Sequence, residues 1–420
     1  MKRNIGFVST RFSGTDGVTL EASKWAQVLR QMGHACFWFA GQLDKDPANS
    51  MLVPEAFFQH EQNQWINARI LGKRRRGASV TEMIHALKTL IKVRLVEFIE
   101  TYAIDLLIAQ NALTIPMHVP LGVALTEIIA ETQIPTIAHH HDFYWERTRF
   151  TVNAVGDYLR MAFPPPLPNM AHVVINSAAQ EELALRTGIS SIIVPNILDF
   201  DNPPKVDVDA VSKIRTAVGL APEDRMVLQP TRVVQRKGIE HAIELVKELK
   251  DPRCKLVVSH EAGDEGFEYA QWLRDEAAEN GIQLIFFSIG MRDPWNDTHA
   301  APGSYSLLDM YPCADFVTYP SLYEGFGNAF LEAIYFKKPL LINRYANFVR
   351  DIEPHGFDLV EMDGYLNAKT VTQVKELLAS PQRLSKMVEH NYAVAARFFS
   401  YAVLRRSLNW LMSRFFGVDA

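Results

Sequence analysis

Residues 318–339 read TYPSLYEGFGNAFLEAIYFKKP, and they join a predicted strand to a predicted helix through a glycine-rich turn. The apolar run 314–319 is typical of a buried strand, which Pro320 and Ser321 end. Gly325 and Gly327 let a ligand approach the backbone closely, and the first amides of the following helix have no partner within that helix. Such a helix end attracts phosphate. The stretch therefore predicts an anion site after a strand.

Two carboxylates flank this predicted anion site. Glu324 lies in the turn, and Glu332 lies about two turns into the helix. The arrangement suits a ligand with hydroxyl groups at both ends and phosphate in the middle, which describes a nucleotide-sugar. A generic strand–turn–helix unit with two surface glutamates is the alternative.

The same residues resemble a known family. Glu324 and Glu332 match the E-x7-E signature of the retaining glycosyltransferases of family 4, and the surrounding sequence from Pro320 to Ala333 is similar to theirs. The resemblance implies an α/β protein with the GT-B fold, two Rossmann-like domains with a cleft between them. It implies that Glu324 orients the sugar hydroxyls and that Glu332 binds the ribose. The donor-binding residues that it assigns to this stretch are Glu324, Gly325, Phe326, Gly327, Asn328 and Glu332.

A second motif, residues 230–238, reads PTRVVQRKG after a predicted strand at 225–229. Arg232 and Lys237 resemble the paired cations with which the family neutralises the donor diphosphate. The chemistry needs such cations, because the departing diphosphate gains negative charge as the sugar–oxygen bond breaks. Arg236 is expected to face solvent, and a surface loop of cations is the alternative reading.

Residues 134–147 contain three consecutive histidines at the end of a predicted strand. Side chains alternate along a strand, so His139 and His141 are expected on one face and His140 on the other. A zinc site is disfavoured because the three cannot all reach one metal ion from a regular strand. The run resembles the family's strand end in which a histidine faces the reacting carbon of the sugar, and alignment with that pattern selects His141. The predicted catalytic residues are therefore His141, Arg232, Lys237 and Glu324.

The residues that follow mix aromatic rings with guanidinium groups that can hold carboxylate or phosphate. We interpret them as the acceptor side of the site, and a packed aromatic loop with surface ion pairs is the alternative. The predicted acceptor-binding residues are His140, Tyr144, Trp145, Arg147 and Arg149.

Two further donor contacts are predicted from the resemblance. Gly17, in the loop after the first strand, is expected near the diphosphate, and Ser288 near the nucleotide base. The first strand–helix unit lacks the G-x-G-x-x-G pattern, which counts against a nicotinamide enzyme. Asp207 and Asp209 form a D-x-D, but helix-start carboxylates explain it better than a metal site. The resemblance implies that no metal or cofactor is required, with the nucleotide-sugar as a co-substrate.

Composition indicates an ordinary globular protein. The chain has 420 residues, 48% of them hydrophobic and 22% charged, so two domains are expected. A net charge of −5 gives no reason to expect a nucleic-acid partner. No segment reads as a secretory signal or a membrane span, and the three cysteines have no metal or redox spacing. We expect buried, reduced thiols and a cytoplasmic protein.

The domain boundaries follow from residues 195–199, PNILD, which resemble the family's crossover between domains. We predict an acceptor domain at 1–196, a donor domain at 197–398, and a terminal helix at 399–420 that packs back on the first domain. The basic, amphipathic pattern at 396–416 leaves peripheral membrane contact as the alternative. The basic run 73–76 is interpreted as a solvated loop, and residues 343–347 are bulkier than the glycine-rich turn usual in the family.

The predicted function is the transfer of a hexose, with retention, from UDP-glucose or GDP-mannose to a hydroxyl group of a small acidic acceptor such as a sugar acid or sugar phosphate. The alternatives are a GT-B phosphorylase, a nucleotide-sugar epimerase, and a glycosyltransferase acting on a lipid or polysaccharide. A non-catalytic binding module on the same scaffold is a further alternative, which the retention of both cations and both glutamates opposes.

Overall fold

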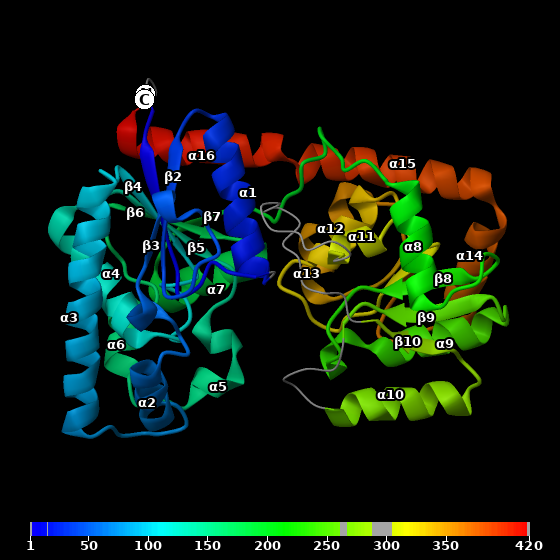
Figure 1. Cartoon of the computed structure of the whole chain (residues 1–420), viewed down its shortest axis with the longest axis horizontal. Coiled ribbons are helices and arrows are strands. Elements are labelled where there is room, and N and C mark those ends of the chain that lie inside the picture. Colours follow the sequence, from blue (N-terminus) through cyan, green and yellow to red (C-terminus); the bar gives the residue numbers. More distant parts are fainter. Residues whose placement is uncertain (1, 15, 261–266, 288–304, 418–420) are drawn as a thin grey trace. The chain divides into compact units, whose positions relative to one another are not determined.

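The computed structural model describes residues 2–14, 16–260, 267–287 and 305–417. The chain divides into two compact units, Met1–Pro195 with Leu404–Ala420, and Asn196–Val403. Each is built on a parallel sheet with helices on both of its faces, as Figure 1 shows. The alternation of strands and helices in the sequence therefore predicted the α/β class correctly.

In the described part of the first unit, seven strands form a parallel sheet in the order β3-β2-β1-β4-β5-β6-β7. The strand order reverses between β1 and β4, and ligands of open α/β sheets bind outside the carboxyl ends of the strands at such a point. The strands are β1 Asn4–Val8, β2 Ala35–Ala40, β3 Ser50–Leu52, β4 Leu106–Gln110, β5 Thr136–His140, β6 Met170–Val174 and β7 Ser191–Ile193. The α-helices are α1 Gly17–Gln31, α2 Glu61–Ile70, α3 Ala78–Thr101, α4 Val119–Thr132, α5 Thr148–Thr151, α6 Gly156–Ala162 and α7 Ser177–Thr187.

In the second unit, the described residues form a six-stranded parallel sheet in the order β10-β9-β8-β11-β12-β13, which reverses between β8 and β11. The strands are β8 Arg225–Gln229, β9 Cys254–Val258, β10 Leu284–Phe286, β11 Phe316–Tyr319, β12 Leu340–Asn343 and β13 Val360–Met362. The α-helices are α8 Val208–Val218, α9 Ile239–Leu249, α10 Phe267–Glu279, α11 Leu307–Met310, α12 Asn328–Tyr335, α13 Ala346–Asp351, α14 Ala368–Ala379 and α15 Pro381–Phe398. Helix α16, Tyr401–Phe416, ends the described chain.

The cores follow from the apolar patterns. In the first unit α3 and α4 pack against the sheet, and α4 is buried along nearly its whole length, as expected of a helix that is apolar on most sides. In the second unit the amphipathic α9 buries its apolar stripe, which includes Ile239, Ile243 and Val246, against β8 and β9. Cys36, Cys254 and Cys313 are buried and free, which confirms the prediction of reduced thiols.

The amphipathic helical pattern at 396–416 covers the end of one helix and the whole of the next. Helix α15 ends at Phe398 and α16 begins at Tyr401. The Phe399 carbonyl accepts a hydrogen bond from the Leu198 amide at 2.9 Å, and Ser400 pairs with Leu198 in a short parallel bridge. The linker after residue 195 therefore hydrogen-bonds to a backbone carbonyl that would accept a bond within the helix if the helix were continuous.

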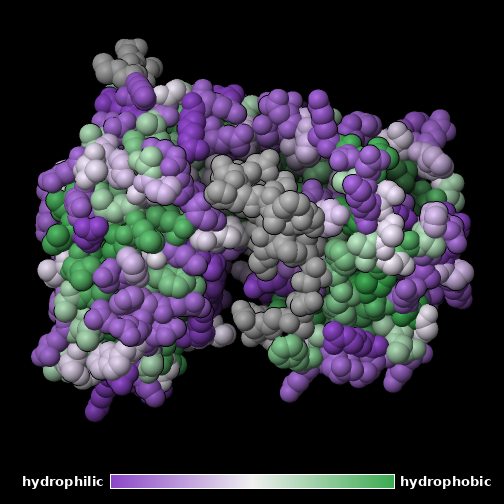
Figure 2. Space-filling view, in the orientation of Figure 1, coloured by the Kyte–Doolittle hydropathy of each residue, from purple (hydrophilic) through white to green (hydrophobic). Residues whose placement is uncertain are grey.

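The apolar face of α16 is covered by the chain itself. Leu404, Leu408 and Leu411 are fully buried, whereas Trp410 is half exposed. The surface along α15 and α16, at the top of Figure 2, is mostly hydrophilic. None of the described helices has the length and apolarity needed to cross a bilayer.

Candidate active site

The loop after β11 carries the predicted anion site. Glu324 is only 9% exposed, and its carboxylate accepts a hydrogen bond from the ammonium group of Lys237, at the end of a short 3₁₀ helix, Gln235–Lys237. Nη1 of Arg236 lies 3.6 Å from the other carboxylate oxygen. Burial lowers the pKa of Lys237, although Glu324 opposes that shift. Because β8 and β11 are neighbours in the sheet, two predicted site residues that are 87 positions apart in sequence meet in a buried ion pair.

Two glycines allow the site loops to pack this closely. Gly238 has φ +61° and Gly327 has φ +114°, which are backbone conformations that other residues rarely adopt. A side chain at Gly238 would collide with the Pro320 carbonyl, and one at Gly327 would collide with the hydroxyl of Tyr345. Gly327, which was predicted as a close-approach position, and Gly238, which was not, thus let the loops after β8, β11 and β12 pack closely.

The segment 343–347, after β12, holds the Glu324 loop in place. Three of its side chains donate hydrogen bonds to four backbone carbonyls of that loop. The bonds run from Asn343 Nδ2 to Ser321 O (3.0 Å), from Tyr345 Oη to Phe326 O (2.6 Å), and from Asn347 Nδ2 to Glu324 O (2.8 Å) and Gly325 O (3.1 Å). The departure from the family's glycine-rich turn therefore has a physical role, which is to fix the shape of the loop that carries Glu324.

Helix α12 carries the second glutamate. Tyr311 donates a hydrogen bond to Glu332 at 2.7 Å, and burial raises the pKa of this phenol well above its usual value, so it remains a donor. At the start of the helix, Asn196 donates to the side-chain oxygen of Asn328 at 2.6 Å. Both α12 side chains assigned to the donor are therefore oriented by neighbours in the same unit.

The remaining cations lie near a histidine that the sequence analysis did not single out. Arg232 is exposed, whereas Arg236, predicted to face solvent, contacts Glu324. His260 follows β9, and its Nδ1 lies 2.9 Å from the Ser259 hydroxyl. Burial lowers the pKa of His260 to about 4, and the positive charges of Arg232 and Lys237 act in the same direction. The carboxyl ends of β8 and β9 thus gather positive charge around a neutral imidazole.

Two other residues, Gly17 and Ser288, were also predicted to bind the donor. Gly17 is the first residue of α1 and follows Asp16, whose carboxylate caps that helix by accepting from the amides of Val18 and Thr19. Ser288 lies outside the described residues.

The histidine run ends β5 in the first unit. The rings of His139 and His141 lie 4.3 Å apart, whereas His140 contacts His172 at 3.0 Å and Thr114 at 2.6 Å on the other face. The predicted alternation is therefore confirmed. His141 Nε2 lies 3.0 Å from the side-chain oxygen of Gln110, and burial lowers the pKa of His141 to about 4. Within the described ranges, no group of three or more His, Cys, Asp or Glu side chains is placed to hold a metal ion.

The structure disperses the predicted acceptor residues. Tyr144 packs against the core of the first unit, and Trp145 stacks on Phe143 at 4.4 Å. The guanidinium of Arg149 lies over the Phe150 ring, and Arg147 donates to Asp142. His140 is buried and engaged by its two neighbours. Among the five, Arg147 borders a pocket of the first unit.

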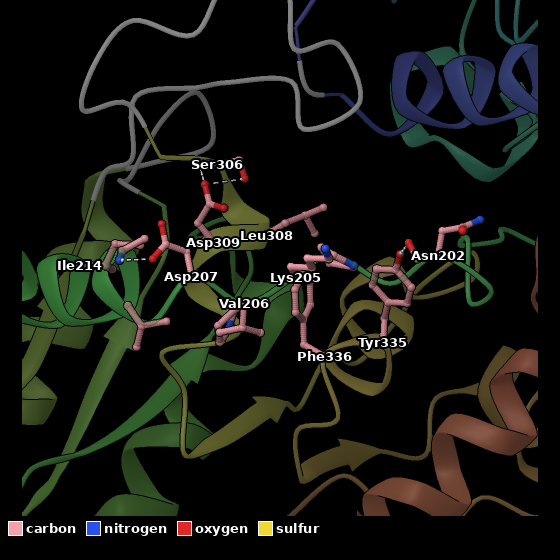
Figure 3. A pocket seen from close by; sticks show the side chains of 14 residues that line it. Asn202, Lys205, Val206, Asp207, Ile214, Ser306, Leu308, Asp309, Tyr335 and Phe336 are labelled. Carbon is pink, nitrogen blue, oxygen red and sulfur yellow. Dashed lines mark hydrogen bonds between the residues drawn. The ribbon is translucent and has the colours of Figure 1, made fainter.

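The second unit also contains a pocket of about 250 Å³, drawn in Figure 3. It lies between the segment 202–211 and the C-terminal end of α12, where Tyr335 and Phe336 form one wall. None of the predicted donor residues that the structure describes is among those that line it. Asp207 borders the pocket and caps α8 by accepting from the amides of Asp209 (2.9 Å) and Ala210 (3.2 Å), which confirms the helix-start interpretation of the D-x-D.

The basic run at residues 73–76 also makes contacts within the first unit. Arg76 donates to both carboxylate oxygens of Asp157 and to the Ala154 carbonyl at 2.7 Å, so this member of the run is not simply solvated.

Comparison with known proteins agrees with this architecture. The family model for group 1 glycosyl transferases matches residues 211–394. Mannosylglucosylglycerate synthase of Thermotoga maritima is 32% identical, with 94% of this chain and 96% of the relative covered. The enzyme of the same name from Petrotoga mobilis is 30% identical, with 96% of this chain and 100% of the relative covered. Among solved structures, Anabaena HepE in complex with UDP and glucose superposes with a TM-score of 0.66 at 14% identity, over 98% of this chain and all of that one. The chain therefore belongs to the group 1 glycosyltransferases with the GT-B fold, the family 4 class that its E-x7-E motif indicates.

Proposed function

We propose that this glycosyltransferase transfers a mannosyl group from GDP-mannose to a hydroxyl group of glucosylglycerate, with retention at the anomeric carbon. The observation that carries the proposal is the identity of 30–32%, over nearly the whole chain, to two enzymes named mannosylglucosylglycerate synthase. Their product contains a mannosyl group linked to glucosylglycerate, a small acceptor with a carboxylate. Such an acceptor belongs to the class of small acidic acceptors predicted from the sequence.

The contacts in the second unit support a role in binding the donor. Lys237 and Arg232 supply positive charge, and the N-terminus of α12 supplies unpaired amides. In the proposed step the bond between the sugar C1 and the diphosphate oxygen breaks, and these groups stabilise the negative charge that the diphosphate gains. Glu324, fixed by Lys237 and by the loop contacts of Asn347, orients the sugar hydroxyls.

The proton of the reaction needs an acceptor. In the proposed mechanism the acceptor hydroxyl attacks C1 on the face from which the diphosphate leaves, and its proton passes to a diphosphate oxygen. The resemblance to the family's strand-end pattern puts His141 beside the reacting carbon of the sugar. Its lowered pKa supports a neutral imidazole, which can form hydrogen bonds to a sugar hydroxyl. Glu332 binds the ribose, residues 326–328 the sugar–phosphate junction, and no metal ion takes part.

Product analysis tests the proposal. Purified protein is incubated with GDP-mannose or UDP-glucose, each with glucosylglycerate, with glycerate, and with no acceptor. We expect nucleotide release and a mannosylated product only with GDP-mannose and glucosylglycerate, and NMR of the product should show retention. Conversion of donor without acceptor, or product formation that requires inorganic phosphate, would instead support an epimerase or a phosphorylase.

A further inference from the structure

A second pocket, of about 190 Å³, lies in the first unit. It is formed where β1 and β4 end, at the point where the strand order of this sheet reverses. This is the position at which ligands of open α/β sheets bind. We call it the arginine pocket. The described residues that line it with polar side chains are Ser9, Thr10, Arg11, Asp16, Asn111, His118 and Arg147.

Two guanidinium groups border the arginine pocket from different elements. Nη2 of Arg11 lies 3.1 Å from Asp16, and Nε of Arg147 donates to Asp142. A guanidinium carries five N–H donors in a planar fork that matches a carboxylate. Each of these contacts engages one edge of its guanidinium, so both side chains are oriented by a carboxylate, and a guanidinium has further N–H donors on its other edges.

The charges around the arginine pocket favour an anion. Asp16 is the one carboxylate among the described residues that line it, and that carboxylate is engaged by the amides of Val18 and Thr19 at the start of α1. His118 also lines the pocket, and burial lowers its pKa to about 4, so it adds no charge at neutral pH. Among the described lining residues, two arginines stand against one carboxylate, which Arg11 and the start of α1 already engage, and the carboxylate that pairs with Arg147, that of Asp142, lies outside the lining.

The arginine pocket is connected to the predicted catalytic histidine. Asn111 lines the pocket, and its side-chain oxygen accepts from the backbone amide of His141 at 3.0 Å. The amide group of the same side chain donates to Asp142 at 2.9 Å, the residue that orients Arg147. Asn111 therefore links the lining of the arginine pocket to the backbone of His141 by one hydrogen bond.

We propose that the arginine pocket binds the carboxylate of the acceptor, with Arg11 and Arg147 as its specificity-determining residues. This inference rests on the proposed function, since it assigns the glycerate end of glucosylglycerate to the first unit. Ser9, Thr10 and Asn111 supply hydrogen-bonding groups for the glycerate hydroxyl. An acceptor in which the carboxylate is replaced by a hydroxymethyl group, glucosylglycerol, loses the contact with both arginines.

The test compares Arg11→Gln and Arg147→Gln with the wild-type protein on glucosylglycerate and on glucosylglycerol. For glucosylglycerate, each substitution should lower kcat/KM by about 10- to 100-fold, the contribution of hydrogen bonds to a charged group. We expect wild-type activity on glucosylglycerol to be low, and each substitution should change that activity and the KM for the donor by no more than about twofold, because the lost contact is to the carboxylate. Arg69→Gln, an exposed arginine on α2, is the matched control and should behave as wild type.

The outcomes separate this inference from the proposed function. Equal losses on the charged and neutral acceptors, or no loss on either, would overturn the carboxylate assignment while leaving the mannosyltransferase intact. If wild-type protein transfers mannose to neither acceptor, the proposed function itself fails. In that case, calorimetry with glucosylglycerate tests whether the arginine pocket binds the carboxylate. Binding that both arginine variants weaken supports the assignment. No binding to the wild-type protein, or equal binding to the variants, overturns it.

Discussion

Lys237 and Glu324 form a buried ion pair that joins the loop after β8 to the loop after β11. A buried charge is costly unless it is paired, so the pair fixes both side chains at the point where the strand order of the second sheet reverses. Glu324 is further held by Arg236, and its backbone by Asn347. The site is thus pre-organised by contacts within one unit.

Replacement of Lys237 by Ala should lower turnover by about 100- to 1000-fold, the cost of removing one group that stabilises a developing anion. The measurement is kcat with saturating donor and acceptor, and circular dichroism checks the fold. Lys247→Ala, an exposed lysine on α9, is the control. Near-normal turnover in Lys237→Ala would refute the assigned role.

Replacement of Asn347 by Ala should raise the KM for the donor while leaving the KM for the acceptor unchanged. It removes two hydrogen bonds to the carbonyls of Glu324 and Gly325, at about 1 kcal/mol each, which corresponds to roughly five- to thirtyfold. Asn391→Ala is a matched control, because Asn391 is another buried asparagine of this unit, bonded to Asp358. Equal effects of the two variants on the donor KM would mean that Asn347 has only a general structural role.

Replacement of Gly327 by Ala should destabilise the protein more than replacement of Gly356. Both glycines have positive φ, and an L residue there costs about 1–2 kcal/mol. The Cβ at Gly327 would also overlap the Tyr345 hydroxyl, adding about 1–3 kcal/mol, whereas nothing lies within 4 Å of a Cβ at Gly356. Thermal unfolding of the two variants measures the difference, and equal losses would contradict the close packing described here.

The histidines should make the protein less stable in acid. Burial lowers the pKa of His118, His141, His172 and His260 to about 4, below the unfolded value of 6.5. Between those values the unfolded chain binds more protons, so stability is complete above pH 6.5 and falls as pH decreases toward 4. Each histidine contributes a slope of at most about 1.4 kcal/mol per pH unit.

The apparent Tm measured from pH 7.5 to 5 checks this dependence. His118→Asn retains a side-chain oxygen for the Leu121 amide at the start of α4 but cannot titrate. Its Tm should therefore change less with pH than that of the wild-type protein. Identical slopes would show that His118 is not kept neutral by burial.

Much of the fold could be predicted from sequence, because the apolar strands alternate with amphipathic helices in both halves of the chain. Motifs at the ends of two such strands also identified Lys237 and Glu324 as candidate site residues, but the ion pair between them was seen only in the structure. The break between α15 and α16 could not be predicted, since it involves a backbone contact with Leu198, more than 200 residues earlier in the chain.

The missed site residues share one cause. Asn347 acts on a loop that is near it only because β12 lies beside β11, and His260 joins the cations only because β9 lies beside β8. Arg11 borders the arginine pocket for the same reason, through the neighbouring strands β1 and β4. A polar residue directly after a buried parallel strand was the available signal in Ser259-His260 and in Ser9-Thr10-Arg11.

In the proposed reaction, cations and a helix end of the second unit bind the pyrophosphate of an activated sugar. A crystal structure of the protein with GDP-mannose, or with GDP, would locate that pyrophosphate. We predict that the diphosphate contacts Lys237, Arg232 and the first amides of α12, with Glu324 beside the sugar. A diphosphate bound elsewhere, or both cations turned away from it, would contradict the account.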